Sequence, residues 1–329
     1  MNTSMLRSRA HEVARRWRAL LSLALLLALT IGAGPARASG ATALAAGDPP
    51  IYGVTIDEVN QLESILGALA ALPVRPTTRV YFDVREPASY YASALTQIDS
   101  VSSVMGELLD SSDEKSISTE AFQARVESYL HALGSEVGIW EVGNEVNGNW
   151  TGSYPTVAAK LTEAYNDVAA TGAASALTLY ANNFGPNNCG DGPAELTPLQ
   201  FAEQYVPSQV ADGLDYVFLS YYPTECGRRE PSSEAVASYM QQLHSVFPNA
   251  ALGFGEVGLP HAVRRSTLKR AERIMRWAYS LKPGLPYYVG GYFWWYGAED
   301  ALHAGAPLAG ALREAFEDES EALAPGSPG

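Results

Sequence analysis

The sequence predicts an α/β fold, a single-domain (β/α)8 TIM barrel. Short apolar, β-branched or aromatic runs alternate with longer helix-like stretches. Eight such units fit in roughly 270 residues, close to the size of this barrel, and repeated βα units imply a parallel sheet. A doubly wound open sheet is the alternative. Because no glycine-rich phosphate loop follows the first run, its nucleotide-binding version has little support.

The expected strands are short runs that end in polar or aromatic residues. In chain order they cover residues 51–56, 78–84, 100–106, 138–145, 177–182, 214–222, 251–256 and 288–295. The third lacks a continuous β-branched run, whereas the others are rich in Val, Ile, Leu, Tyr or Phe.

The expected helices carry apolar residues at helical spacing. They cover residues 57–71, 118–134, 154–170, 197–205, 232–246, 263–280 and 304–316. Asp57 is the expected N-cap of the first helix, since Asp accepts hydrogen bonds from the first free backbone N–H groups.

The amino-terminal segment has the three parts of a secretory signal peptide. Arginines precede an apolar run from Ala19 to about Gly34, and Ala36-Arg37-Ala38 forms an A-x-A cleavage site. A membrane anchor is the alternative, but the apolar run is short for a span. We therefore expect residues 1–38 to be removed and the protein to be extracellular or periplasmic, with no membrane contact after cleavage.

The remaining boundaries follow from composition. Residues 39–49 are expected to form a short linker, 50–316 the (β/α)8 barrel, and 317–329, which are acidic and contain Pro and Gly, a disordered tail. No second domain is predicted, and we expect a monomer.

The charge of the chain is strongly negative. The net charge is −14, and removing residues 1–38, with six arginines and one glutamate, changes it to −19. Such a surface repels phosphates, so nucleic acid is not an expected partner. It also disfavours a strongly anionic polysaccharide.

The two cysteines, Cys189 and Cys226, both lie in polar loop sequence. In an oxidising compartment an even pair of loop cysteines predicts one disulfide. The histidines are scattered and none is close to either cysteine, so we expect no metal site. No cofactor fingerprint is present either, and no cofactor is expected.

Polar residues at the strand ends are the candidate site, because a TIM barrel holds its active site at the carboxyl ends of its strands. They are Asp83, Asn144, Glu145, Asn182, Tyr222, Glu256 and Trp295. Two carboxylates can act as acid and nucleophile at a glycosidic bond, and aromatic rings can stack on sugar faces. The predicted partner is therefore a poly- or oligosaccharide.

The motif Trp140-Glu141-Val142-Gly143-Asn144-Glu145-Val146-Asn147 resembles the fourth-strand motif of clan A of the glycoside hydrolases, which are retaining (β/α)8 glycosidases. The resemblance covers the whole mature chain. It implies that Glu145 is the acid/base and that Glu256, in a Gly-Glu-x-Gly context, is the nucleophile. Asn144 would bind the sugar hydroxyl next to the anomeric carbon.

The resemblance implies further substrate-binding residues. Arg79 matches a strand-two arginine, and its alternation with Tyr81 and Asp83 favours the barrel interior. Tyr222 or Tyr221 matches a tyrosine that contacts the nucleophile. Trp295 or Trp294 matches the tryptophan that ends strand eight, and one of the two is expected to pack outward.

Four positions depart from the common clan pattern: Gly143, Val146, Gly255 and Ser220, the last in the place of a histidine. We expect these smaller residues to open the pocket floor. Glu141, four residues before Glu145, is expected to lie deeper and to be structural. Trp150, Tyr154 and Phe184, in rim loops, fit stacking platforms and ordinary loop packing equally well.

The predicted function is a secreted retaining glycosidase. The alternatives are a non-catalytic carbohydrate-binding barrel, an inverting hydrolase whose carboxyl groups lie farther apart, and a transglycosidase with the same residues. The sugar, the linkage and exo or endo action do not follow from the sequence.

Overall fold

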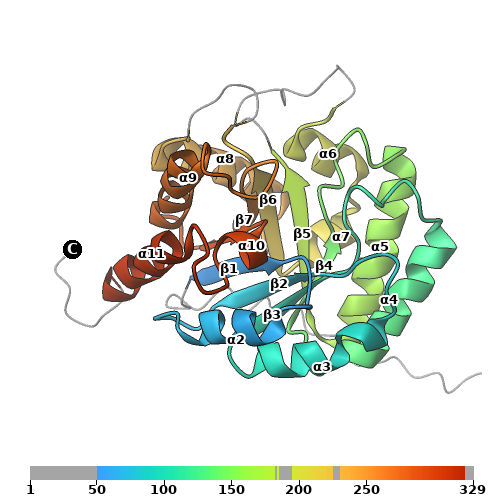
Figure 1. The fold of residues 1–329 in the computed structure, drawn as a ribbon. Helices are drawn as coiled ribbons and strands as arrows, with labels where there is room; N and C mark the ends of the chain where they lie inside the picture. The colour runs from blue at the N-terminus through green and yellow to red at the C-terminus, as the bar shows by residue number, and fades with distance from the viewer. Residues whose placement is uncertain (1–49, 182–183, 185–194, 225–229, 323–329) are drawn as a thin grey trace, which may run out of the picture. The chain divides into compact units, whose positions relative to one another are not determined.

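The computed structural model describes residues 50–181, 184, 195–224 and 230–322, all in one compact unit. Eight parallel strands pair in chain order, and β8 pairs with β1 to close the barrel (Figure 1). The predicted single-domain (β/α)8 barrel is thus confirmed. The strands are β1 Ile51–Ile56, β2 Thr77–Tyr81, β3 Ser103–Glu107, β4 Ile139–Gly143, β5 Ala174–Tyr180, β6 Tyr216–Tyr221, β7 Ala251–Val257 and β8 Tyr288–Trp294.

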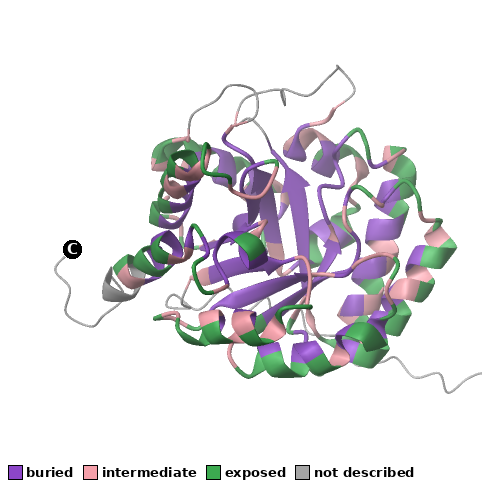
Figure 2. Ribbon diagram, in the orientation of Figure 1, coloured by how far each residue is buried: buried purple, intermediate pink, exposed green. Residues whose placement is uncertain are grey.

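The helices surround the barrel, and Figure 2 shows that the strands are buried while the outer helix faces are exposed. They are α2 Leu62–Ala70, α3 Ala88–Asp99, α4 Thr119–Leu133, α5 Tyr154–Thr171, α6 Pro198–Tyr205, α7 Ser208–Gly213, α8 Ser233–Val246, α9 Leu268–Ser280, α10 Gly297–Asp300 and α11 Ala309–Ala322. None of these described helices is long and apolar enough to cross a membrane.

The core has two parts, which follow from the alternation of side chains along each strand. A large cluster fills the space between strands and helices and includes Val217 and Leu219 of β6. A smaller cluster inside the barrel includes Phe218 of β6, with Met105 and Phe293. The inward positions nearest the carboxyl ends of the strands are therefore left for polar groups.

Several helices differ from the sequence-based expectation. Helix α2 begins at Leu62 after an N-cap at Gln61, so Asp57 is not its cap. Asp57 instead follows β1 and lies close enough to Glu299 to interact with it. Helix α9 begins at Leu268 rather than at residue 263.

Strand β3 and helix α11 both extend past their expected ends. β3 continues to Glu107, whose side chain is fully buried and has Oε2 at 3.1 Å from Arg79 Nη2. Helix α11 continues to Ala322, so that residues 317–322 are helical, and Arg313 and Glu317 form an ion pair one turn apart.

Three groups of expectations lie outside the described residues. They are the signal peptide and linker over 1–49, residues 323–329 of the tail, and Asn182 with the cysteine pair Cys189 and Cys226.

Candidate active site

Six of the predicted site residues meet at the carboxyl ends of the strands. They are Arg79 of β2, Asn144 and Glu145 directly after β4, Tyr222 directly after β6, Glu256 of β7 and Trp295 directly after β8. The hydrogen bonds, ion pairs and charge interactions described below connect them into one site.

Glu256 is held by two donors. The Tyr222 hydroxyl donates to Oε1 at 2.5 Å, and Arg79 Nη1 donates to Oε2 at 3.1 Å. The side chain is buried, and burial raises its pKa to about 7, while the charge of Arg79 and the hydrogen bond from Tyr222 oppose that rise. Both donors favour the ionised form, which is the form a nucleophile needs.

Arg79 is fully buried and lies among three carboxyl groups. Its Nε donates to Glu141 Oε2 at 2.7 Å, and its Nη2 lies 3.1 Å from Glu107 Oε2. Its guanidinium carbon lies 5.2 Å from the centre of the Trp295 ring, a cation–π arrangement. The guanidinium is therefore fixed in orientation before it reaches Glu256.

Glu145 is buried between two serine hydroxyls. Ser220 Oγ donates to Oε1 at 2.6 Å, and Ser111 Oγ donates to Oε2 at 2.8 Å. Burial raises the pKa of Glu145 to about 8, the charge of Glu256 adds to the rise, and the two hydroxyls oppose it. A carboxyl group that stays protonated near neutrality is suited to act as an acid.

The backbone at Glu145 is in the left-handed region, with φ of +46°. This conformation is costly for a residue with a side chain and is concentrated at functional sites. It follows the end of β4, where the register with β5 shifts between Glu141 and Gly143. The turn brings the carboxyl group of Glu145 to the hydroxyls of Ser111 and Ser220.

Asn144 is buried beside the acid/base candidate. Its Oδ1 accepts a hydrogen bond from the backbone N–H of Ser111 at 3.0 Å. This bond fixes the orientation of the amide. Its Nδ2 has no hydrogen-bond partner among the described residues and is available as a donor to a ligand.

The structure separates the two adjacent aromatic pairs. Tyr222 contacts Glu256, whereas Tyr221 packs against Phe254 in the core outside the barrel. Trp295 lies over Arg79, whereas Trp294 is buried in the core and donates its indole N–H to Asp300. Tyr222 and Trp295 therefore belong to the site, and Tyr221 and Trp294 support it from outside.

Asp83 lies beyond the end of β2 and takes no part in these contacts. Arg85 donates to both of its carboxyl oxygens. These hydrogen bonds are the main reason why the pKa of Asp83 is lowered to about 2. Asp83 is thus an ionised rim residue whose charge is already balanced by Arg85.

The expectation that small residues open the pocket floor is wrong for two glycines. A Cβ at Gly143 would lie 2.8 Å from Val146 and 3.3 Å from Leu161 of α5, so this position faces a helix. A Cβ at Gly255 would lie 2.5 Å from Thr178 Oγ1. Both glycines permit close packing and leave no added space for a ligand.

Sequence reasoning missed Glu107 and Ser111. Glu107 ends β3 and pairs in register with Glu141 of β4. Ser111 lies in the loop that follows β3. The signal that could have found both is the rule already used for the other strands, because polar residues at the end of β3 also reach the barrel mouth.

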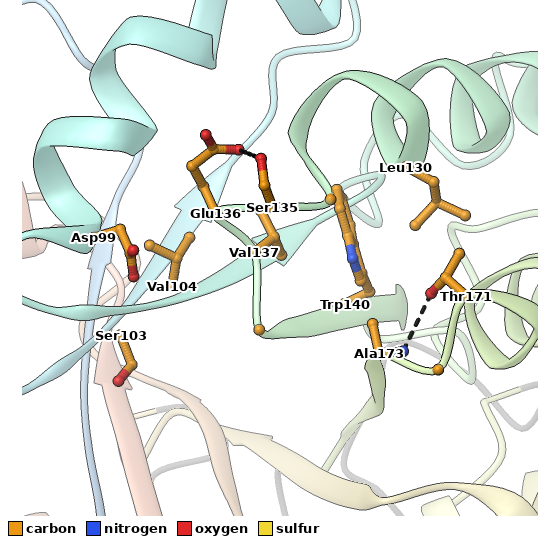
Figure 3. Close-up of a pocket in the computed structure, with 13 residues that line it drawn as sticks. Asp99, Ser103, Val104, Leu130, Ser135, Glu136, Val137, Trp140, Thr171 and Ala173 are labelled. Atoms are coloured by element: carbon orange, nitrogen blue, oxygen red, sulfur yellow. Dashed lines mark hydrogen bonds between the residues drawn. The ribbon is translucent and has the colours of Figure 1, made fainter.

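A cavity of about 470 Å³ lies at the opposite end of the strands (Figure 3). Its lining includes Ser103 at the start of β3, Ala173 just before β5, and Glu136 and Thr171 from the turns that end helices α4 and α5. In this fold the amino-terminal face serves stability rather than chemistry. The cavity is therefore separate from the carboxylate pair.

The described part of the chain contains no group of three or more His, Cys, Asp or Glu residues placed to hold a metal ion. At the barrel mouth the described residues bring the carboxyl groups of Glu145 and Glu256 together with an arginine and a tyrosine.

Comparison of the sequence with protein-family models and with curated proteins gives no match. The fold does have known counterparts. A β-glucosidase from Thermotoga maritima in complex with galacto-hydroximolactam is 12% identical, with a TM-score of 0.54 over 76% of this chain and 89% of that chain. A GH10 xylanase from Bispora sp. MEY-1 with xylobiose is 13% identical, with a TM-score of 0.54 over 80% and 96% of the two chains.

The exo-β-1,4-mannosidase Op5Man5 from Opitutaceae bacterium strain TAV5 is 13% identical, with a TM-score of 0.52 over 84% of this chain and 61% of that chain. At such identities the likeness concerns the fold. The fold that these proteins share with this chain is the (β/α)8 barrel predicted from the sequence.

Proposed function

We propose that the protein is a secreted retaining glycoside hydrolase in which Glu145 is the acid/base and Glu256 is the nucleophile. The observation that carries the proposal is the different set of partners around the two carboxyl groups. Arg79 and Tyr222 donate hydrogen bonds to Glu256 and oppose the rise of its pKa, whereas the charge of Glu256 adds to the rise of the pKa of Glu145. A carboxyl group that is stabilised as the carboxylate, beside one that is more easily protonated, is what a nucleophile and an acid require.

In the first step a carboxylate oxygen of Glu256 forms a bond to the anomeric carbon. The glycosidic C–O bond breaks, its electron pair moves to the leaving oxygen, and Glu145 gives that oxygen its proton. Loss of the negative charge on Glu256 leaves Glu145 to ionise more easily, since that charge helped to raise its pKa. Glu145 is then ready to act as the base.

In the second step Glu145 takes a proton from water as the water oxygen attacks the anomeric carbon. The bond to Glu256 breaks, and its electron pair returns to the carboxylate, which Arg79 and Tyr222 again stabilise. Both residues return to their starting states, and the anomeric configuration is retained. Arg79, Asn144, Tyr222 and Trp295 are the proposed substrate-binding residues, with Asn144 Nδ2 as a donor to a sugar hydroxyl.

The proposed substrate is a neutral poly- or oligosaccharide. Asp110 and Asp113 lie near the mouth and interact with Tyr81 of β2, and the site itself holds several further carboxyl groups. This surplus of negative charge repels uronic acids and sulfated sugars. The names of the structural counterparts make β-glucosides, β-xylosides and β-mannosides the first compounds to test.

Replacing Glu256 tests the proposal. Glu256→Ala should lower kcat on the order of 10⁴-fold or more, and sodium azide should restore turnover of an activated aryl glycoside with a glycosyl azide of inverted configuration. Glu136→Ala, in the cavity at the other end of the barrel, is the matched control and should keep full activity. Ordinary hydrolysis by Glu256→Ala would show that the assignment is wrong.

Product analysis with the same glycosides separates the alternatives. Product of inverted configuration from the parent enzyme would identify an inverting hydrolase, and binding of oligosaccharides without any product would identify a binding barrel. Transfer to added alcohols or sugars in preference to water would identify a transglycosidase.

Secretion and the disulfide are part of the proposal. The amino terminus of protein recovered from the medium or periplasm should be Ser39. Mass spectrometry without reduction should find the peptides of Cys189 and Cys226 joined. Intact protein that begins at Met1 and remains in the cell would contradict secretion.

A further inference from the structure

A chain of hydrogen bonds links Glu145 to the protein surface. Trp150 Nε1 donates to Ser111 Oγ at 3.1 Å, and Ser111 Oγ lies 2.8 Å from Glu145 Oε2. Trp150 is 37% exposed, whereas Ser111 and Glu145 are buried. An exposed aromatic side chain therefore contacts the hydrogen-bond partner of the acid/base candidate.

The direction of this chain follows from the chemistry of its members. An indole N–H can only donate, so Ser111 Oγ accepts from Trp150 and has its own proton available for Glu145. Oε2 of Glu145 therefore accepts this hydrogen bond whether or not Glu145 is protonated. When Glu145 is protonated, its proton belongs on Oε1, beside Ser220, whose hydroxyl can either accept or donate.

The Trp150 ring is held in place on two sides. A Cβ at Gly148 would lie 2.5 Å from the ring, so only glycine lets the ring lie this close to the backbone. Tyr180 packs against the ring edge-on, with the centroids 5.0 Å apart. The remaining ring surface is exposed, and an exposed aromatic face can stack on a sugar.

The position of the ring relative to Glu145 indicates which sugar it contacts. The acid delivers its proton to the leaving oxygen, so a platform beside the acid lies on the leaving-group side of the scissile bond. Trp295, beside Arg79 and near Glu256, lies on the nucleophile side. The two tryptophans are therefore suited to different sugars.

On the basis of the function proposed above, we propose that Trp150 binds the sugar on the leaving-group side and that Trp150 and Ser111 tune the acidity of Glu145. In the first step the proton on Oε1 passes to the glycosidic oxygen, which takes the electron pair of the breaking C–O bond. In the second step water returns a proton to Glu145. Ser111 donates to Oε2 throughout and is a positioning residue.

The titratable groups that face Glu145 come from three other elements. They are Glu256 of β7, Asp110 of the loop after β3 and Tyr222 after β6. Substitution of Ser111 or Trp150 leaves all three in place. A changed pH profile in such variants therefore reports the lost hydrogen bond.

The test uses the full chain with Ser111→Ala, Trp150→Phe and Trp150→Ala. Because the lost donor stabilised the carboxylate, Ser111→Ala should move the basic limb of the kcat/KM profile up on the order of 1 pH unit. Trp150→Phe, which keeps a ring, should give a smaller shift in the same direction. Both effects should appear on oligosaccharides and vanish on 2,4-dinitrophenyl glycosides, whose leaving group needs no proton.

Trp150→Ala should also raise KM for oligosaccharides about tenfold, with little effect on dinitrophenyl glycosides. Ser111→Thr keeps a hydroxyl and should stay close to the parent profile. Trp277→Phe is the matched control, because its indole N–H donates to Pro231 O away from the site. This variant should show neither effect.

Binding without turnover separates this inference from the proposed function. Glu256→Ala protein is titrated with cellohexaose, xylohexaose and mannohexaose, and binding is measured by tryptophan fluorescence. We expect binding, and adding Trp150→Ala to this variant should weaken it about tenfold. An unchanged affinity would overturn the role of Trp150, even if hydrolysis itself failed. An unchanged basic limb in both Ser111→Ala and Trp150→Phe would overturn the tuning of Glu145.

Discussion

Arg79 Nη1 lies 3.1 Å from Glu256 Oε2, and the other two nitrogens of the same guanidinium face Glu107 and Glu141. One cation therefore stands among three carboxyl groups that are almost fully buried. Three carboxylates around one guanidinium would leave an uncompensated charge away from water, which is very costly. At least one of the three must carry a proton.

Glu107 is the member of this group that we expect to hold a proton. Neither of its oxygens accepts a hydrogen bond from a described residue, although Arg79 Nη2 lies 3.1 Å away, and burial raises its pKa well above the usual range. Glu141, in contrast, accepts from Arg79 Nε at 2.7 Å. Arg79 therefore donates hydrogen bonds to Glu141 and Glu256 but not to Glu107.

The amide variants of these two residues should behave differently. Glu107→Gln resembles the neutral acid and should keep kcat/KM within about tenfold of the parent, whereas Glu141→Gln breaks a buried ion pair and should lose at least about 100-fold. Steady-state kinetics with thermal unfolding of both variants measures this. Equal losses in the two would contradict the assigned protonation.

Removing the Tyr222 hydroxyl should raise the pKa of the nucleophile. Tyr222→Phe takes a donor from ionised Glu256, so the acidic limb of kcat/KM should move up on the order of 1 pH unit. The pH profile measures the effect. Tyr221→Phe, one residue away and facing the outer core, should keep the parent limb; a shift of similar size in that variant would point to general loosening.

How far the sequence predicted the site depends on the element. Strands β4 and β7 are apolar runs that stop at a polar residue, so Asn144, Glu145 and Glu256 could be placed at the barrel mouth from the sequence. On β6 the alternation that places Phe218 inside also places Ser220 and Tyr222 inside. The choice of Tyr222 over Tyr221 could therefore have been made in advance.

The inward-facing residues of strand β8 could not be predicted in the same way. Gly290, Gly291, Tyr292 and Phe293 all have positive φ, and the register with β7 shifts at the start of the strand. A strand with this backbone does not follow a two-residue period. The contact between Ser111 and Trp150 could not be predicted for a different reason, because the two residues lie in separate loops and meet only through the folded barrel.

The raised pKa values of the two candidates should make the folded protein less stable as pH rises. Glu145 titrates near 8 and Glu256 near 7 in the native state, against an ordinary value of 4.5. Between about pH 4.5 and 8 the native state therefore binds more protons than the unfolded state, and the free energy of unfolding falls with pH. Below this window the contribution is fully present.

Glu145→Gln should remove much of that slope. From pH 5 to pH 8 the free energy of unfolding, measured with denaturant, should fall in the parent protein. In Glu145→Gln this fall should be smaller by on the order of 2 kcal/mol. Glu136→Gln, at the other end of the barrel, should keep the parent slope. A slope unchanged by Glu145→Gln would mean that Glu145 titrates alike in the folded and unfolded states.

A second buried ion pair holds the loop that carries Ser111. Lys160 Nζ of α5 lies 3.1 Å from Glu114 Oε1, and both side chains are buried. Lys160→Met leaves Glu114 buried without its cation and should lower the free energy of unfolding by about 3–5 kcal/mol, as measured by urea unfolding. Because Glu114 and Ser111 share this loop, the variant should also move the basic limb of kcat/KM upward.

Two further variants separate the contribution of the Lys160–Glu114 ion pair from a general effect of losing a lysine. Lys160→Met with Glu114→Gln removes both charges and should recover part of the stability, since no uncompensated charge remains. Arg276→Met breaks an exposed pair with Glu314 and should cost less than about 1 kcal/mol. If Lys160→Met costs no more than Arg276→Met, the loop is held by its packing and not by this ion pair.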